Sequence, residues 1–268
     1  MDIDGFTFNV LHEGDASQPL IILCHALMSN LHMWDSTVEA LNAAGFSTLR
    51  YDHIGHGQTS VPVADRVGRI HIDDFCRYIN EMVQRTIPGK RPYGFIGCSI
   101  GGVIALRYGL MYPEQLSYIV SCDAPGMTSL EESKIKWKDR MKMFREQGVE
   151  PLARATVERW FPDPCPPEVK RESLQHTMSV SFLGYAACAE AIMNYDYTSE
   201  LGNIKTDKTA VMILAGENDE AIGPQEILID VHQRISGSRY VLMKDTGHIP
   251  PMHQAAEFER IVISFLKG

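Results

Sequence analysis

Long apolar runs are missing from this 268-residue sequence. The apolar stretches are the size of a single strand, such as LIILC at residues 20–24, so no segment is expected to span a bilayer. The N-terminal residues carry acids before their first apolar run and lack the basic start of a signal peptide. We therefore expect a cytoplasmic protein without a membrane partner.

Positive charge is also scarce. The chain has 25 Lys and Arg against 34 Asp and Glu, which gives a formal net charge of -9. A negative surplus repels the phosphate backbone of nucleic acids, so no nucleic-acid partner is expected.

Metal-binding cysteine motifs are absent. The six cysteines form no C-x-x-C pair and no Cys/His cluster with the spacing of a zinc site, so no metal is expected. Widely scattered thiols are typical of small buried groups in a reducing compartment. These residues are Cys24, Cys76, Cys98, Cys122, Cys165 and Cys188.

Short apolar runs bounded by turn residues alternate along the chain with longer segments of helical periodicity. This alternation is typical of the α/β class, with a mostly parallel central sheet flanked by helices in one domain. The expected strands cover residues 6–13, 20–26, 47–53, 93–99, 116–124, 209–217 and 238–245, and the first expected helices cover 33–45, 72–85 and 101–113.

The alternation stops between residues 127 and 198. Segments 129–148, 152–161 and 176–195 have helical patterns with no strand between them. We interpret 127–198 as a helical cap, or lid, inserted into a core made of 1–126 and 199–268. Its aromatic residues exceed what one amphipathic stripe requires, so Trp137 and Trp160 are candidates for contact with a substrate. Packing within the cap's own core is an equal alternative for any one aromatic residue.

One motif carries a specific chemistry. Gly97-Cys98-Ser99-Ile100-Gly101 joins an expected strand to an expected helix. A bare G-x-S-x-G is weak, but in this setting it indicates a sharp turn that projects the serine hydroxyl above the sheet. Ser99 is therefore the candidate nucleophile. An alcohol is a poor nucleophile at neutral pH, so a base and an orienting acid are expected with it.

The acid and the base are sought in the chain order Ser, acid, His that accompanies this kind of turn. Asp219 follows the expected strand 209–217, at the end where active-site loops of open sheets gather. His248 lies in a loop after the last expected strand. Asp123 also follows a strand and is the rival acid. We predict Asp219 as the acid and His248 as the base.

Attack on a carbonyl creates an oxyanion, which fixed backbone N–H groups stabilise. The residue after the nucleophile, Ile100, is expected to donate one bond. The second donor is expected from the loop after strand 20–26, at Leu27. His25 in the same loop is a candidate for substrate contact. The histidines in the glycine-rich segment DHIGHG are interpreted as parts of a tight turn.

With these residues identified, the sequence resembles the 3-oxoadipate enol-lactonase branch of the α/β-hydrolase superfamily. The resemblance spans most of the chain and includes GCSIGG, RATVERWF, GYAACAEAI and TGH. It implies an α/β-hydrolase fold with a helical lid and a catalytic triad of Ser99, Asp219 and His248. It also implies an acyl pocket bordered by Trp160, and no cofactor.

The leading functional hypothesis is hydrolysis of a small lactone or carboxylic ester through an acyl-serine intermediate. One alternative is hydrolysis of a C–C bond in a β-diketone or ring-fission product. The other is a non-hydrolytic role on the same fold, as a cyclase, an isomerase or a ligand receptor. A small molecule is the expected partner, and both a monomer and a homo-oligomer fit the sequence.

Overall fold

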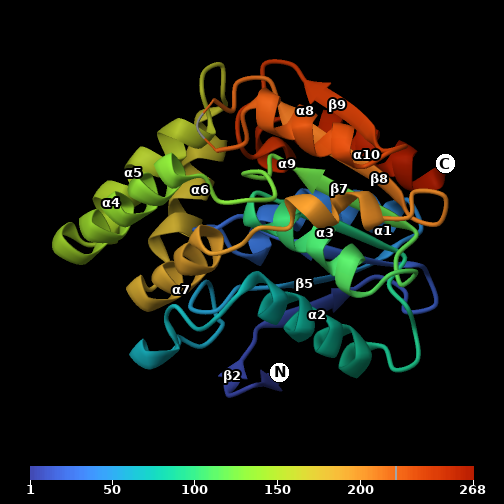
Figure 1. Ribbon diagram of the computed structural model, residues 1–268, viewed down its shortest axis with the longest axis horizontal. Helices are drawn as coiled ribbons and strands as arrows, with labels where there is room; N and C mark the ends of the chain where they lie inside the picture. The colour runs from blue at the N-terminus through green and yellow to red at the C-terminus, as the bar shows by residue number, and fades with distance from the viewer. Residues whose placement is uncertain (221) are drawn as a thin grey trace.

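The computed structural model describes residues 1–220 and 222–268, in which a seven-stranded sheet lies between two layers of helices (Figure 1). The first strand pair of this sheet is antiparallel and the other neighbouring pairs are parallel. The prediction of a mostly parallel α/β sheet is therefore confirmed. In spatial order the strands are β3 (Val10–Glu13), β5 (Ser47–Tyr51), β4 (Leu20–Cys24), β6 (Gly94–Cys98), β7 (Tyr118–Cys122), β8 (Ala210–Gly216) and β9 (Arg239–Met243).

The central strands are continuous apolar runs because helices cover both of their faces. Every residue of β4 and β6 is buried. The expected strand 6–13 is instead divided into β2 (Phe6–Thr7), which pairs with β1 (Asp2–Ile3), and β3. The break lies at Asn9, whose backbone N–H and side-chain amide bond to Thr59 and Asp52.

Helices flank the sheet in two sets. In one set α2 (Ile72–Thr86) contacts α3 (Ile100–Met111), and in the other α1 (Asp35–Ala43) contacts α10 (Ala255–Lys267). The crossover from β4 to β5 contains α1, and the crossover from β5 to β6 contains α2 and runs in the opposite direction along the sheet. Because both crossovers are expected to be right-handed, α1 and α2 lie on opposite faces. No helix in the described ranges has the length and apolar character needed to cross a membrane. The core also contains α8 (Gln225–Arg234), α9 (Pro250–His253), and the 3-10 helices η1 (Leu31–Trp34), η2 (Ala64–Arg66) and η3 (Thr198–Asn203).

Four helices lie between β7 and β8: α4 (Glu131–Gln147), α5 (Val149–Trp160), α6 (Pro167–Met178) and α7 (Phe182–Met193). The prediction of one helix over 176–195 is wrong, because α6 ends at Met178 and α7 begins only at Phe182. The Ser181 hydroxyl accepts a hydrogen bond from Gly184 N and donates one to Gly55 O, both at 3.0 Å. This cap starts α7 afresh and joins it to the loop after β5.

The order of the strands creates a crevice at the carboxyl ends of β4 and β6. The chain passes from β4 to β5 on one side and then crosses back to β6 on the other. At such a reversal the loops leaving the carboxyl ends of the two strands separate and leave room for a ligand. Cys24 pairs with Gly97 in the β4–β6 register, so residues 25–28 and Ser99 emerge beside each other.

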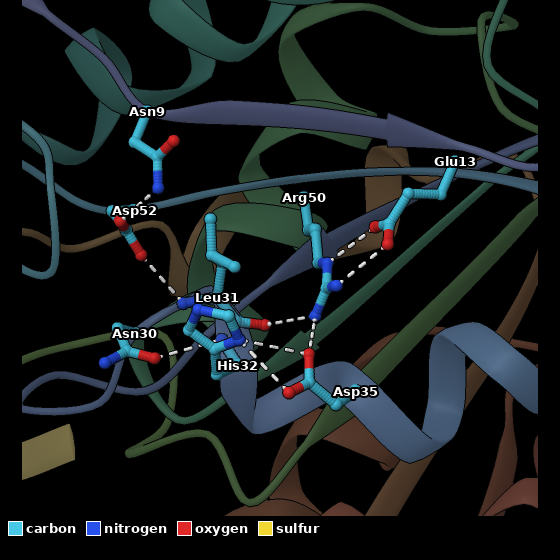
Figure 2. Close-up of polar contacts among 8 residues, drawn as sticks. All are labelled: Asn9, Glu13, Asn30, Leu31, His32, Asp35, Arg50 and Asp52. Atoms are coloured by element: carbon cyan, nitrogen blue, oxygen red, sulfur yellow. Dashed lines mark hydrogen bonds and ion pairs between the residues drawn. The ribbon is translucent and has the colours of Figure 1, made fainter. Parts of the chain in front are cut away.

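A buried arginine anchors the loop that leaves β4 (Figure 2). Arg50 of β5 is 5% exposed. Its Nε and Nη2 donate to the two carboxylate oxygens of Glu13 at 2.7 and 2.9 Å, and its Nη1 donates to Leu31 O at 3.0 Å and to Asp35. A bidentate pair of this kind is among the stronger and more directional polar contacts in proteins.

Asp52 holds the other side of the same peptide group (Figure 2). Its Oδ1 accepts from Leu31 N at 2.8 Å, and its Oδ2 accepts from Asn9 Nδ2 at 2.8 Å and from Gln58 N at 2.9 Å. Leu31 is thus held through its N–H by Asp52 and through its C=O by Arg50. The far end of the loop after β4 is therefore fixed by two charged side chains.

We predict that Arg50→Met lowers the free energy of unfolding by about 2–4 kcal/mol, because it leaves two carboxylates and a carbonyl without their donor. Urea unfolding measures this loss. The matched control is Arg234→Met, which removes an exposed ion pair with Asp230 on α8 and should leave the unfolding midpoint unchanged. Equal effects of the two substitutions would contradict the anchoring role of Arg50.

Candidate active site

Ser99 occupies a strained turn between β6 and α3. Its backbone has φ +59° and ψ -122°, a combination that L-residues adopt only where the surroundings enforce it. The Ser99 N–H donates to Cys122 O at 2.8 Å, and Ser99 O accepts from Gly102 N at 2.9 Å. Strand β7 and the first turn of α3 therefore hold the serine in this conformation.

The glycines of the motif are required by close backbone approach. A Cβ atom on Gly97 would lie 1.9 Å from Gly101 O, and a Cβ on Gly101 would lie 2.2 Å from Cys24 O. Both separations are far below van der Waals contact. Any side chain at either position would force α3 away from β4 and β6, and would displace Ser99 with it.

His248 and Asp219 form a buried pair. Their Nδ1 and Oδ2 atoms are 2.6 Å apart, and the residues are 1% and 2% exposed. Asp219 also accepts from Gly223 N at 2.8 Å and Ile222 N at 3.2 Å. Burial by itself raises the pKa of this carboxyl, but the His248 charge and these hydrogen bonds outweigh burial and hold the pKa below its ordinary value. Asp219 is therefore ionised at neutral pH and fixes His248 Nδ1 as a donor.

The rival acid, Asp123, bonds to groups other than a histidine. Asp123 is fully buried, and its Oδ1 accepts from Gly216 N at 2.8 Å while its Oδ2 contacts Cys122 Sγ at 3.3 Å. Burial, together with the nearby Asp219 charge, raises the pKa of Asp123 well above its ordinary value. In the described residues it bonds to no histidine. The structure brings Asp219, and not Asp123, to His248.

The candidate nucleophile and the candidate base line the same cavity. Ser99 and His248 line it from the sheet, and Trp160 borders His248 with their ring centroids 6.0 Å apart. No hydrogen bond reaches the Ser99 hydroxyl from another residue in the described part of the chain, a common condition before substrate binds. The other lining residues are Leu27, Met28, Trp137, Thr156, Arg159, Tyr185 and Ile222.

Leu27 and Ile100, whose backbone N–H groups are the predicted oxyanion donors, lie at the candidate site. Leu27 lines the cavity, and Ile100 opens α3 directly after Ser99. Neither amide donates a hydrogen bond to any residue that the structure describes. By contrast, Met28 N, directly after Leu27, donates to His56, and Gly102 N, two residues after Ile100, donates to Ser99 O. The first N–H groups of a helix have no partner within it, so Ile100 also offers the positive end of the α3 dipole.

The prediction that His25 contacts substrate is not supported. His25 is fully buried and does not line the cavity. Its Nε2 accepts from His53 N at 2.9 Å, and its Nδ1 lies 2.8 Å from Ala26 O. The ring is therefore occupied in fixing the loop after β4.

His56 has a role that the sequence did not reveal. Its Nε2 accepts from Met28 N at 3.2 Å, and its Nδ1 lies 2.9 Å from Ile54 O. These contacts tie the loop that contains Leu27 to the loop after β5. His253 has a parallel role on the other side, where it accepts from Gly247 N at 2.9 Å and reaches Pro164 O at 3.1 Å. The glycines around His56 indicated a tight turn, but no sequence signal indicated which groups these two histidines bond.

Burial makes the His56 ring a source of pH-dependent stability. Burial lowers its pKa to about 4 from an ordinary value of 6.5. The unfolded chain takes up this proton below pH 6.5 while the folded chain does not, so the free energy of unfolding falls as the pH falls from 6.5 to 4. The size of the His56 contribution is about 3 kcal/mol at pH 4.

We predict that this acid sensitivity is reduced in His56→Gln, whose amide keeps an acceptor for Met28 N. Urea unfolding between pH 7 and 4 should show the wild type losing about 3 kcal/mol more than the variant. Asp123, with its raised pKa, acts in the opposite direction but is common to both proteins and cancels in the difference. Parallel stability curves for the two proteins would disprove the assignment.

Comparisons with known proteins agree with this fold. Residues 19–254 match the family model described as the alpha/beta hydrolase fold. The chain is 26% identical over 259 residues to 3-oxoadipate enol-lactonase 2 of Acinetobacter baylyi, covering 95% of this chain and 91% of that protein. It is 23% identical over 276 residues to a putative 2-succinyl-6-hydroxy-2,4-cyclohexadiene-1-carboxylate synthase of Bacillus subtilis, covering 98% and 96%. The crystal structure of the enol-lactonase from Burkholderia xenovorans superposes with a TM-score of 0.88 at 25% identity, covering 99% of this chain and 98% of that one.

Proposed function

This chain belongs to the alpha/beta hydrolase fold family, and on that basis we propose that it hydrolyses a small lactone or carboxylic ester through an acyl-Ser99 intermediate. The observation that carries the proposal is the meeting of Ser99 and His248 in one cavity, with Asp219 bonded to the far nitrogen of the histidine. The similarity to two enol-lactonases supports the class of bond.

In the proposed acylation step, His248 Nε2 takes the proton of the Ser99 hydroxyl as Oγ bonds to the carbonyl carbon of the substrate. The resulting oxyanion accepts hydrogen bonds from the N–H groups of Leu27 and Ile100, each worth about 2.7–4 kcal/mol of barrier. The ester C–O bond then breaks, and His248 returns the proton to the leaving oxygen. In a lactone that oxygen stays attached to the acyl chain.

In the proposed deacylation step, His248 takes a proton from water, whose oxygen bonds to the acyl carbon. The bond between that carbon and Ser99 Oγ breaks, and Ser99 recovers the proton from His248. Asp219 remains ionised throughout and stabilises the imidazolium that forms in each half-reaction. The products are a carboxylic acid and an alcohol, or a hydroxy or keto acid from a lactone.

We propose that residues 127–198 act as the cap of this site, over a core of 1–126 and 199–268. Trp137 and Trp160 contribute apolar surface from the cap, which would hold the substrate and limit the entry of bulk water. A cytoplasmic setting fits the six free cysteines, of which Cys165 alone is not fully buried.

We predict that an uncharged fluorophosphonate labels the wild-type protein once, at Ser99, and leaves Ser99→Ala unlabelled. Intact-mass spectrometry followed by peptide mapping measures the adduct. The substitution removes a hydroxyl and no core volume, so the fold should persist while kcat for an ester falls by at least about 10⁴-fold. Retained turnover in a folded Ser99→Ala protein would overturn the mechanism.

The two candidate acids are separated by a matched pair of substitutions. Asp219→Asn should lower kcat by about 10³–10⁴-fold, because the amide no longer stabilises protonated His248. Asp123→Asn keeps an acceptor for Gly216 N and replaces a carboxyl whose pKa is raised by burial and which bonds to no described histidine, so we expect activity within about threefold of wild type. Steady-state kinetics on one ester measures both, and an equal loss at Asp123 would reverse the assignment.

One observation favours a second candidate function. The similar protein from Bacillus subtilis is named a synthase, so the same residues could serve a non-hydrolytic reaction here. Product analysis in isotope-labelled water separates the two. Labelled oxygen in a carboxylic acid product indicates hydrolysis, with an alcohol as co-product for an ester and a ketone for a C–C bond. A rearranged or eliminated product without the label indicates the second function.

A further inference from the structure

The loop that contains Leu27 is a tight turn with a strained residue. Ser29 N donates to Ala26 O at 3.0 Å, which closes a four-residue β-turn with Leu27 and Met28 at its centre. Met28 has a backbone φ of +71°, whereas the φ of Leu27 is not positive. These values are those of a type II turn, which normally has glycine or asparagine at the position of Met28. A methionine there is held against its preference, and such outliers gather at functional sites.

The ring of His56 holds this turn by its central peptide. His56 Nε2 accepts from Met28 N at 3.2 Å, and its Nδ1 lies 2.9 Å from Ile54 O. A carbonyl oxygen can only accept, so Nδ1 carries the ring proton and Nε2 keeps the lone pair that Met28 N requires. Burial lowers the pKa of His56 to about 4, so the ring stays neutral at pH 7.

The competing conformation of the turn would contain no strained residue. Rotation of the Leu27–Met28 peptide by about 180° converts a type II turn into a type I turn, in which both central residues have a negative φ. After this rotation, Leu27 O would face His56 Nε2 in place of Met28 N, and two acceptors cannot form a hydrogen bond. A neutral His56 therefore selects the type II turn.

The same rotation would displace the predicted oxyanion donor. Leu27 lines the cavity and belongs to the rotating peptide through its C=O, so its backbone torsion ψ changes and its N–H shifts. A donor stabilises an oxyanion only when it is aimed at the position where the charge develops. His56 does not line the cavity, so it can influence the reaction only through the backbone of this loop.

We propose that His56 is a positioning residue for catalysis, which keeps the Leu27 amide aimed at the oxyanion by selecting the type II turn. This inference rests on the proposed function. It places the effect of His56 in the transition state and not in substrate binding, because hydrogen bonds to the carbonyl oxygen strengthen as that oxygen becomes charged. A purely structural role would lower stability without this selectivity.

The kinetic test compares an ester with its thiono analogue, in which sulfur replaces the carbonyl oxygen. The substrates are 4-nitrophenyl butyrate and O-4-nitrophenyl thiobutyrate, and released 4-nitrophenolate reports on both. Sulfur is a weak hydrogen-bond acceptor, so the ratio of the two kcat/KM values measures the oxyanion site. In His56→Leu, we expect kcat for the oxygen ester to fall about 10–100-fold with KM within about threefold, and the ratio to fall at least about fivefold.

Two further histidine variants complete the kinetic test. His56→Gln keeps an acceptor for Met28 N, so kcat and the ratio should stay within about threefold of wild type. His253→Leu is the matched control, because His253 is also buried and its Nδ1 accepts from Gly247 N at 2.9 Å, on the side of the base His248. Any loss in this control should be equal for the two esters. An unchanged ratio in a folded His56→Leu protein would overturn the proposal.

Substitutions at Met28 test the turn without altering His56. Glycine adopts a positive φ without strain, so Met28→Gly should keep the ratio within about threefold of wild type. A β-branched residue resists a positive φ, so Met28→Val should lower the ratio in the same direction as His56→Leu. Equal ratios in the two Met28 variants would overturn the proposal, including the case in which His56→Leu does not fold.

A nuclear magnetic resonance measurement keeps the turn testable if the proposed hydrolysis fails. In a type II turn the Hα of Leu27 lies close to the amide proton of Met28, whereas in a type I turn the two amide protons lie close together. Nuclear Overhauser effects should show the first contact in wild type and the second in His56→Leu. Failure of Ser99 labelling and of ester turnover in wild type rejects the hydrolase, whereas a type II turn that persists in His56→Leu rejects the role of His56.

Discussion

The close approach of α3 to the strands beside it is the constraint on which the site depends. Glycine at 97 and 101 lets the helix start within van der Waals contact of β4 and β6, and this proximity forces Ser99 into a left-handed conformation. The same turn leaves the Ile100 amide without a partner among the described residues. One steric arrangement thus produces both an exposed hydroxyl and an oxyanion donor.

The loop opposite Ser99 is held by different forces at its two ends. Near η1, Arg50 donates a hydrogen bond to the C=O of Leu31, and Asp52 accepts one from its N–H (Figure 2). Near β4, His25 and His56 act as neutral acceptors, a role that burial protects by lowering their pKa. The Leu27 amide lies between these tethers, so its orientation depends on groups that never face the cavity.

Core and inserted helices supply different parts of the cavity. The core contributes Ser99, directly after β6, and His248, in the loop after β9, where its N–H donates to Trp160 O at 3.0 Å. Helices α4, α5 and α7 contribute Trp137, Arg159 and Tyr185, which determine the size and charge of what can bind.

The sequence by itself determined the α/β class, the turn at Ser99 and the order of Asp219 and His248, because each depends on local patterns: apolar periodicity, glycines at fixed offsets, and residues that follow strands. The structure alone decided what depends on contacts between distant segments. Only the structure shows that His248 Nδ1 lies 2.6 Å from Asp219 Oδ2 and that His25 does not line the cavity. It also shows that segment 176–195 forms parts of two helices, separated near Ser181, whose hydroxyl bonds to Gly55 O. It also left Arg159 Nε and the Tyr185 hydroxyl without a hydrogen-bond partner among the described residues. The presence of a partner depends on three-dimensional proximity, which no local pattern encodes.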